Sequence, residues 1–222
     1  MNARSNTFEI KCAEHQINDI VSALFHSVLY YRTHGKVTYK NEYSYSVGTL
    51  GYEEVTCDFF NFTYIRCASS CLVESLNRSI KDFTDKLRDS NQSVGVISLE
   101  FFKRKKTRGM MVFFNDPSLV WEIWSIKITL VNDECSRTEE IENLLLDKLI
   151  TIVQIVNGSR CNIPQMPDQR NVDSVFDVSY EDAQPYLHRI TYRIGSGSNS
   201  SLNQAGVGDL GFRKFIKDAF AL

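Results

Sequence analysis

Cysteine and histidine are the side chains of this sequence best suited to binding a metal ion, and they are widely scattered. Cys67-x-x-x-Cys71 is the one close cysteine pair, with Cys67 ending a predicted strand and Cys71 beginning a predicted helix. A structural zinc site needs four ligands at short spacings. The sequence has no second such pair, and the nearest histidine along the chain is His34. We therefore expect small buried thiols here, without a metal or cofactor.

Residues for nucleophilic or acid–base catalysis form no recognisable constellation. His26 falls in a predicted helix and His188 in a predicted strand, and no serine or cysteine lies in a catalytic signature. The adjacent pairs Glu53-Glu54 and Glu139-Glu140 are poor dyads, because neighbours on a strand or helix point in different directions. We expect no catalytic residue. An active site assembled only in three dimensions is the enzymatic alternative that the sequence leaves open.

Three glycines near the end of the chain match a dinucleotide-binding fingerprint, Gly206-x-Gly208-x-x-Gly211. That motif works only after a strand, at the start of a βαβ unit, with an acidic residue about 20 positions further on. Here the chain ends at Leu222. We expect the Gly-, Ser- and Asn-rich segment 195–211 to be mobile rather than to bind a nucleotide.

A basic run, Lys103-Arg104-Lys105-Lys106, is followed closely by Arg108. It has two interpretations: contact with phosphate or an acidic membrane surface, or charges that prevent pairing at a strand end. The formal net charge of -2 argues against nucleic-acid binding over the whole surface. Any membrane contact is expected to be peripheral, because the most apolar long stretch, 119–131, contains Glu122 and Lys127 and is too short to span a bilayer.

The N-terminal sequence MNARSNTFEIKC lacks the apolar region of a secretory signal. We therefore expect a cytosolic or nuclear protein with reduced cysteines. The 222 residues, 43% of them hydrophobic, suffice for one core without a metal or disulfide.

An apolar segment, Gly109-Met110-Met111-Val112-Phe113-Phe114, separates the basic run from the turn signal Asn115-Asp116-Pro117. It therefore lies in a loop between two predicted strands. One interpretation is that it folds back onto the core, since burying each large apolar side chain is worth about 1.5–3 kcal/mol. The other is that a partner covers it, because Phe supplies contact area and Met adaptability at binding surfaces. Spacing alone does not decide between them.

Hydrophobic periodicity predicts the elements that hold these residues. We expect strands at 7–12, 56–67, 93–104, 119–131 and 186–194, a hairpin or two weak strands at 36–48, and an extended connection at 160–185. We expect helices at 14–32 (ended by Gly35), from Ser69 or Ser70 to Leu87, from the capping box Ser136–Glu139 to Gly158, and at 212–222. The strands and helices do not alternate strictly. This indicates an α+β fold, mainly an antiparallel sheet with three longer helices packed on it, and a single domain over 1–222.

Short matches in a shared order run through nearly the whole chain and are similar to one family. They are Met1-Asn2-x-Arg4-Ser5, Gly35-Lys36, Tyr39-Lys40, Tyr45-Ser46-x-Gly48-Thr49, Cys57-Asp58-Phe59, Phe62-Thr63-Tyr64, Ser98-Leu99-Glu100-Phe101, Trp121-Glu122-x-Trp124, Pro164-x-Met166-Pro167, Val175-Phe176-Asp177, Gln184-Pro185-Tyr186-Leu187, Ile216-Lys217-Asp218 and Ala221-Leu222. On these residues the chain resembles the autophagy-related protein 101 family, whose members are HORMA-domain subunits of the kinase complex that starts autophagosome formation.

The resemblance implies a HORMA-like fold and a non-enzymatic adaptor in autophagosome formation. It implies pairing with the HORMA domain of autophagy-related protein 13 within the autophagy-initiating kinase complex. It implies a cytoplasmic protein that is recruited to the preautophagosomal structure. It further implies an exposed Trp-Phe loop between two strands that recruits downstream autophagy factors, and this loop maps between Arg108 and Trp121.

The sequence departs from the family in that loop, because the family's Trp is absent. Met110, Met111, Val112, Phe113 and Phe114 stand in its place and are the predicted protein-binding residues, with Phe113 or Phe114 as the aromatic tip. A second candidate function is a HORMA-type regulator of cell division or meiosis that traps a peptide under a mobile C-terminal segment. The helix predicted at 212–222 either packs on its own sheet or docks a partner.

Overall fold

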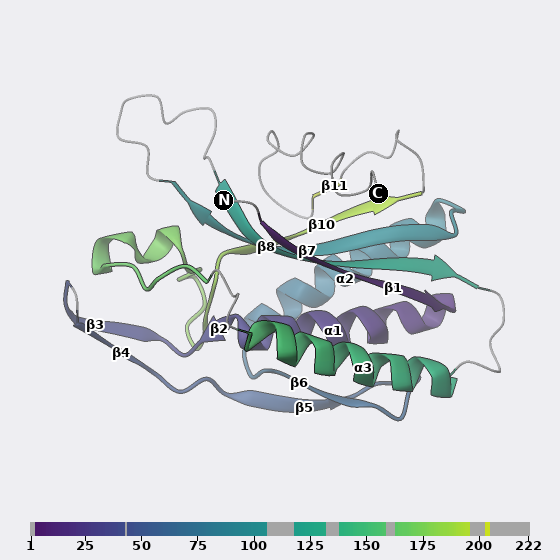
Figure 1. Cartoon of the computed structure of the whole chain (residues 1–222), viewed down its shortest axis with the longest axis horizontal. Helices are drawn as coiled ribbons and strands as arrows, with labels where there is room; N and C mark the ends of the chain where they lie inside the picture. The colour runs from purple at the N-terminus through teal and green to yellow at the C-terminus, as the bar shows by residue number, and fades with distance from the viewer. Residues whose placement is uncertain are drawn as a thin grey trace.

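The computed structural model describes residues 3–42, 44–105, 118–131, 138–158, 163–195 and 203–204. These residues form the following strands, α-helices and 3-10 helices: β1 (Arg4–Cys12), η1 (Glu14–Gln16), α1 (Ile17–Tyr31), β2 (Thr33–His34), β3 (Val37–Asn41), β4 (Ser44–Val47), β5 (Tyr52–Thr56), β6 (Thr63–Cys67), α2 (Ser70–Asp89), β7 (Val94–Arg104), β8 (Ser118–Leu130), α3 (Thr138–Val156), η2 (Gln169–Ser174), β9 (Gln184–Pro185), β10 (His188–Ile194) and β11 (Asn203–Gln204). Figure 1 shows how they are arranged in space.

The main sheet has the strand order β1-β8-β7-β10-β11. The pairs β8–β7, β7–β10 and β10–β11 are antiparallel, and β1 pairs in parallel with β8. Three two-stranded pairs, β2-β9, β3-β4 and β5-β6, complete the described sheets. Mixed helix and strand content with mostly antiparallel pairing confirms the predicted α+β, HORMA-like fold.

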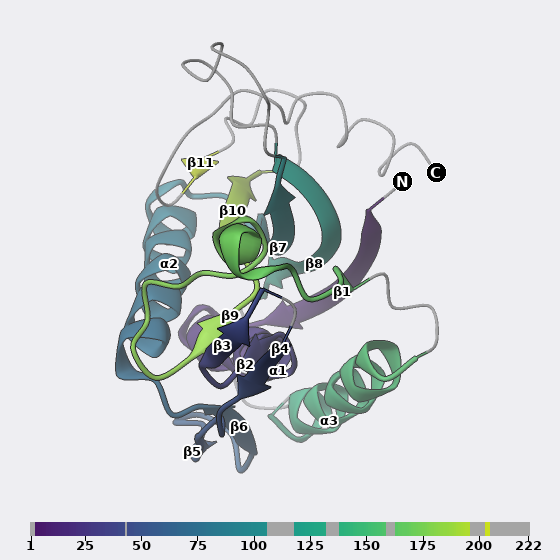
Figure 2. The same ribbon diagram turned by 90° about the vertical axis from the view of Figure 1, so that its left-hand side faces the viewer.

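Helix α1 lies at the centre of the fold, between the main sheet and the outer elements. It packs against α2, α3 and β6 (Figures 1 and 2). Ten of its side chains are buried, and they lie on every side of the helix. The sequence pattern predicted an amphipathic helix, but α1 is enclosed almost all round because neighbours cover each of its faces.

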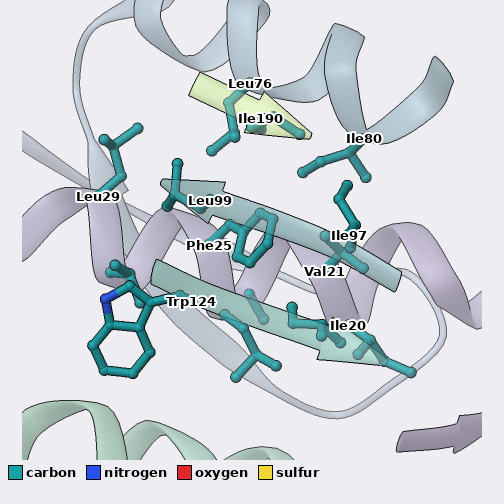
Figure 3. Packing of buried hydrophobic residues seen from close by; sticks show 14 of the residues in the cluster. Ile20, Val21, Phe25, Leu29, Leu76, Ile80, Ile97, Leu99, Trp124 and Ile190 are labelled. Atoms are coloured by element: carbon teal, nitrogen blue, oxygen red, sulfur yellow. The ribbon is translucent and has the colours of Figure 1, made fainter. Parts of the chain in front are cut away.

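The hydrophobic core lies between one face of the main sheet and helices α1 and α2. Alternate residues of β7 and β8, such as Ile97, Leu99 and Trp124, point toward the helices (Figure 3). Phe25 of α1 and Ile80 of α2 meet them from the other side. Because strand side chains alternate between faces, the same strands present their remaining residues to the opposite face of the sheet.

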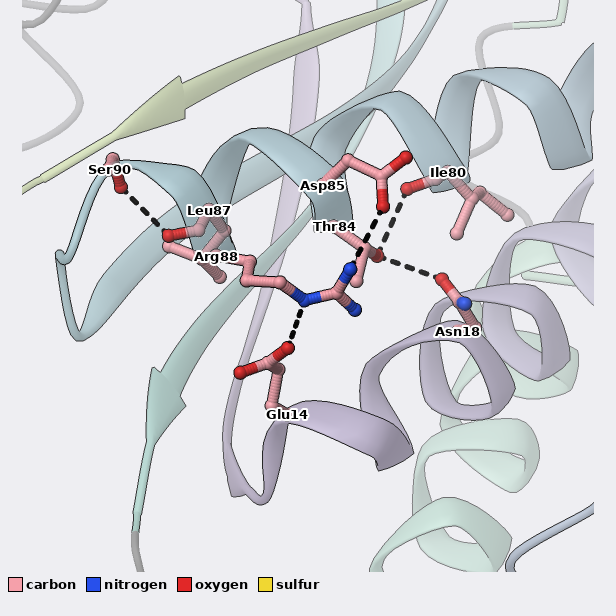
Figure 4. Close-up of polar contacts among 8 residues, drawn as sticks. All are labelled: Glu14, Asn18, Ile80, Thr84, Asp85, Leu87, Arg88 and Ser90. Carbon is pink, nitrogen blue, oxygen red and sulfur yellow. Dashed lines mark hydrogen bonds and ion pairs between the residues drawn. The ribbon is translucent and has the colours of Figure 1, made fainter.

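Polar contacts join α2 to the start of α1 (Figure 4). The Thr84 hydroxyl lies 2.8 Å from Asn18 Oδ1 and 3.1 Å from the carbonyl oxygen of Ile80. Arg88 forms an ion pair with Glu14 of η1. Arg88 and Glu14 are exposed, so that pair adds little to stability, and the apolar contacts beneath it carry the packing of the two helices.

Two predictions of local structure are wrong. The single strand predicted at 56–67 is limited to β6, and the residues before it form the turn of the β5–β6 hairpin, where Cys57 and Phe60 are buried. The Cys57 N–H donates to the carbonyl of Phe62 across this turn, at 2.9 Å. Gly35 does not end the first helix, which closes at Tyr31 with the Arg32 N–H bonded to the carbonyls of Leu29 and Tyr30.

Other predicted features agree with the structure only in part or lie outside the described residues. Ser69 is the N-cap residue of α2, but its hydroxyl donates to Asp182 rather than to the helix. The connection predicted at 160–185 is interrupted by the 3-10 helix η2. The capping residue Ser136, the glycine motif at 206–211 and the helix at 212–222 lie outside the described residues.

Gly35 is required for a close approach of two backbone segments. A Cβ atom at this position would lie 2.1 Å from the carbonyl oxygen of Gly48. We expect Gly35→Ala to lower the free energy of unfolding by about 1–3 kcal/mol, measured by urea denaturation. Gly158→Ala is the matched control, since its closest contact is 3.2 Å. Equal effects of the two substitutions would contradict this role for Gly35.

Candidate protein-interaction site

The predicted binding loop is carried by the hairpin of β7 and β8. The two strands pair along their whole length, as far as Arg104 opposite Ser118. They therefore hold the ends of the connecting segment side by side at the end of the main sheet (Figure 1). Met110, Met111, Val112, Phe113 and Phe114 themselves lie outside the described residues.

A β-bulge lies near this end of the hairpin. Phe101 pairs with Glu122 and Phe102 with Val120, so Trp121 is the extra residue of β8. A bulge turns two successive side chains toward the same side of a strand. Trp121 and Glu122 are accordingly both buried, and both contact Arg32 at the end of α1.

Arg32 and Glu122 form a buried, bidentate ion pair. Arg32 Nε lies 2.7 Å and Nη2 3.0 Å from the two carboxylate oxygens. The guanidinium carbon lies 5.9 Å from the centre of the Trp121 ring, a cation–π arrangement. The Tyr186 N–H donates to the backbone carbonyl of Arg32, so the pair connects α1, the hairpin and the segment before β10.

A second charged group braces the opposite face of the same hairpin. Glu100, only 1% exposed, accepts from Arg189 Nε at 2.8 Å and from the Thr191 hydroxyl at 3.0 Å. Arg189 also donates to the Ser118 hydroxyl at 3.3 Å and lies over the Phe102 ring. Burial raises the pKa of Glu100, and Arg189 and Thr191 oppose that shift by stabilising the carboxylate.

Helix α3 presents a second candidate surface. Its predicted apolar stripe faces the core, with Ile141, Leu145, Ile152 and Val156 buried. Leu146, Ile150 and Val153 are nevertheless 51%, 48% and 39% exposed. Spacings of four and three residues put these side chains on one face of the helix. We call them the outer face of α3.

Sequence reasoning missed the outer face of α3 as a functional candidate. The available signal was that α3 is apolar on more than one side, whereas a helix packed on a single core has one apolar stripe. Exposing several large apolar side chains together is costly, and proteins do so chiefly where a partner covers them.

The residues considered for catalysis or metal binding lie in different places. Burial raises the pKa of the Cys12 and Cys57 thiols to about 12 and that of Cys67 to about 11, so these thiols stay protonated at neutral pH. Cys71 is exposed. Burial lowers the pKa of His26 to about 4, although its hydrogen bond to Asn77 opposes this shift. Across the described ranges, no three His, Cys, Asp or Glu residues gather in a group that could hold a metal ion.

No helix in the described part of the chain is both long and apolar enough to cross a membrane.

Comparison with known proteins gives one consistent result. The family model for autophagy-related protein 101 matches residues 9–170. The chain is 38% identical to autophagy-related protein 101 of Xenopus tropicalis, and 36% identical to the proteins of that name from Bos taurus and Homo sapiens. Each alignment covers 100% of both chains.

The buried ion pair gives a stability prediction. Glu122→Ala leaves the Arg32 guanidinium buried without its carboxylate, and should lower the free energy of unfolding by about 3–5 kcal/mol. Arg32→Met with Glu122→Leu removes both charges and should recover most of that loss. The control is Glu53→Ala, which removes an exposed ion pair with Arg66 and should cost at most about 1 kcal/mol. Urea denaturation of the four proteins measures all three effects. A double variant no more stable than Glu122→Ala would contradict the ion-pair account.

Proposed function

The chain belongs to the autophagy-related protein 101 family and has a role in autophagy, and from this premise we propose that it is a non-catalytic adaptor that connects other proteins through apolar surfaces. One surface pairs with the HORMA domain of autophagy-related protein 13. The other, at the end of the β7–β8 hairpin, recruits downstream autophagy factors. The chain would thereby enter the autophagy-initiating kinase complex and act in the cytoplasm, at the preautophagosomal structure.

The outer face of α3 is the observation that best supports pairing with a folded partner. Leu146, Ile150 and Val153 form an exposed apolar row on a helix that is anchored by its other face. Apolar residues at such spacings are typical anchors where a helix meets an apolar surface. Because α3 is fixed by its buried side chains, a partner would find this row already ordered and would lose less entropy on binding.

The hairpin end is proposed as the second surface. The Arg32–Glu122 pair and the Glu100–Arg189 pair brace the two sheet faces of this hairpin near its end. A braced hairpin holds Arg104 and Ser118, the last paired residues of the two strands, at a defined place in the fold. We assign the recruiting role to Met110, Met111, Val112, Phe113 and Phe114, because their sequence position matches the family's recruiting loop and they are large and apolar.

A charge on the outer face of α3 should block pairing. Leu146→Lys with Ile150→Lys should weaken the affinity for the HORMA domain of autophagy-related protein 13 by at least tenfold, since burying an unpaired ammonium is costly. Calorimetric titration measures the affinity, and an unchanged melting temperature shows that folding is intact. The control is Val47→Lys, which adds the same charge at an exposed apolar residue of β4 instead of α3 and should leave the affinity unchanged. Unchanged affinity in the double variant would place pairing on another surface.

Removing the aromatic side chains of the loop should separate recruitment from pairing. Phe113→Ala with Phe114→Ala should leave the melting temperature and HORMA pairing intact but lower autophagosome formation in complemented cells, because a partner loses its apolar anchors. Counting autophagosomes in cells that express each variant at equal level is the measurement. An unfolded double variant would instead mean that these side chains belong to the core.

A further inference from the structure

A cavity of about 580 Å³ lies between strand β3 and the 3-10 helix η2. Residues 36–39, which lead into and form β3, line one side of it. Val172 of η2 and the exposed Val178 supply apolar surface, and Gln184 of β9 completes the lining. The cavity therefore runs beside four successive residues at the start of β3 and has both apolar and polar walls, and we call it the β3 groove.

Gln184 brings an unused hydrogen-bond donor to this groove. The residue is only 3% exposed, and its Oε1 accepts from the Val37 N–H at 3.2 Å. This bond fixes the orientation of the amide, because a backbone N–H can only donate. Nε2 is then left with no hydrogen-bond partner among the described residues. An unpaired buried donor destabilises the fold, and a ligand that supplies an acceptor would recover part of that cost.

The backbone of β3 also faces this groove. Strand β3 pairs only with β4 within the described residues. The Val37 N–H points to Gln184 rather than to β4, so Val37 and Val47 form a non-hydrogen-bonded pair. Such pairs recur at every second residue of an antiparallel ladder. Tyr39, opposite Tyr45, therefore also turns its N–H and C=O away from β4.

An unused acceptor lies at the same end of the molecule. Asp168 precedes Gln169, which lines the groove, and its Oδ1 is buried with no partner in the described part of the chain. The Tyr39 hydroxyl donates to the carbonyl of the neighbouring Pro167 at 2.7 Å, which places this segment beside β3. Gln184 Nε2 and the main-chain groups of Tyr39 lie along this edge of β3, and Asp168 Oδ1 lies in the neighbouring segment. Together they match the alternating N–H and C=O groups of an extended polypeptide.

We propose that the β3 groove binds an extended segment of a partner polypeptide, which adds to the free edge of β3 and accepts a hydrogen bond from Gln184 Nε2. The main-chain groups of Tyr39 pair with those of the segment. Val172 and Val178 contact its side chains on alternate positions, as in other cases of strand addition. This site is separate from the outer face of α3, so pairing through α3 and peptide binding at β3 can fail independently.

Because recognition is through main-chain groups, a generic peptide serves as the probe. The probe is a blocked pentapeptide of alternating threonine and valine, titrated into the ¹⁵N-labelled full chain. We expect saturable shifts of the Val37 and Tyr39 amides and of the Gln184 side-chain amide in the millimolar range. The same peptide N-methylated at every residue has no N–H to donate from either edge, so it cannot complete the strand pairing and should produce no such shifts.

Two substitutions test the groove itself. Gln184→Glu keeps an acceptor for the Val37 N–H but removes the donor, and should weaken the probe's affinity about fivefold. Val178→Lys should weaken it as well, whereas Val47→Lys should not, because Val47 is equally exposed, at 47%, but does not line the groove. The proposal is overturned if the three amides show no saturable shift, if the N-methylated peptide binds equally, or if Val47→Lys weakens binding as much as Val178→Lys.

Discussion

The buried contact between Arg32 and Glu122 connects the central helix α1 to the β7–β8 hairpin, whose end we propose as a binding surface. Arg32 closes the central helix, and Glu122 follows the bulged Trp121 in β8. Two charge-assisted hydrogen bonds fix the guanidinium in one plane. An intact buried ion pair adds little net stability, because desolvation of the two charges offsets their attraction. Its main consequence is that it fixes the positions of Arg32 and Glu122 relative to each other. The helix that organises the core thereby also sets the position of the β7–β8 hairpin.

The same central helix explains why some apolar residues remain exposed on the surface of the fold. The main sheet, α2, β6 and α3 all cover α1. Each outer element uses only one of its faces to bury the side chains of α1, and its other face is left outside the core. Helix α2 has a polar outer surface, but α3 carries Leu146, Ile150 and Val153 there. Strand β3 similarly uses one edge for β4 and leaves the other beside Gln184. The fold thus completes its core and still offers apolar and main-chain surfaces outside it.

The sequence allowed prediction of elements that are set by local hydrophobic pattern, but not of features that depend on contacts with distant segments. The stripes of α2 and α3 and the alternation of β7 and β8 follow from periodicity, so these elements and the α+β class were predictable. The turn at Cys57–Phe60 was missed because aromatic residues favour a strand in isolation, whereas here Phe60 is drawn into the core. The bulge at Trp121, the parallel partner of β1 and the close approach at Gly35 all depend on segments far away in the sequence. The outer face of α3 was visible as surplus apolar residues, but only packing shows which side remains exposed.

The central claim, that the chain acts by pairing through apolar surface on α3, is tested most directly by hydrogen–deuterium exchange. The free chain is compared with its complex with the HORMA domain of autophagy-related protein 13. The account predicts slower exchange in peptides covering 144–156 on binding, with those of α2 unchanged. Protection confined to α2 or to the β5–β6 hairpin, with α3 exchanging as in the free chain, would contradict it.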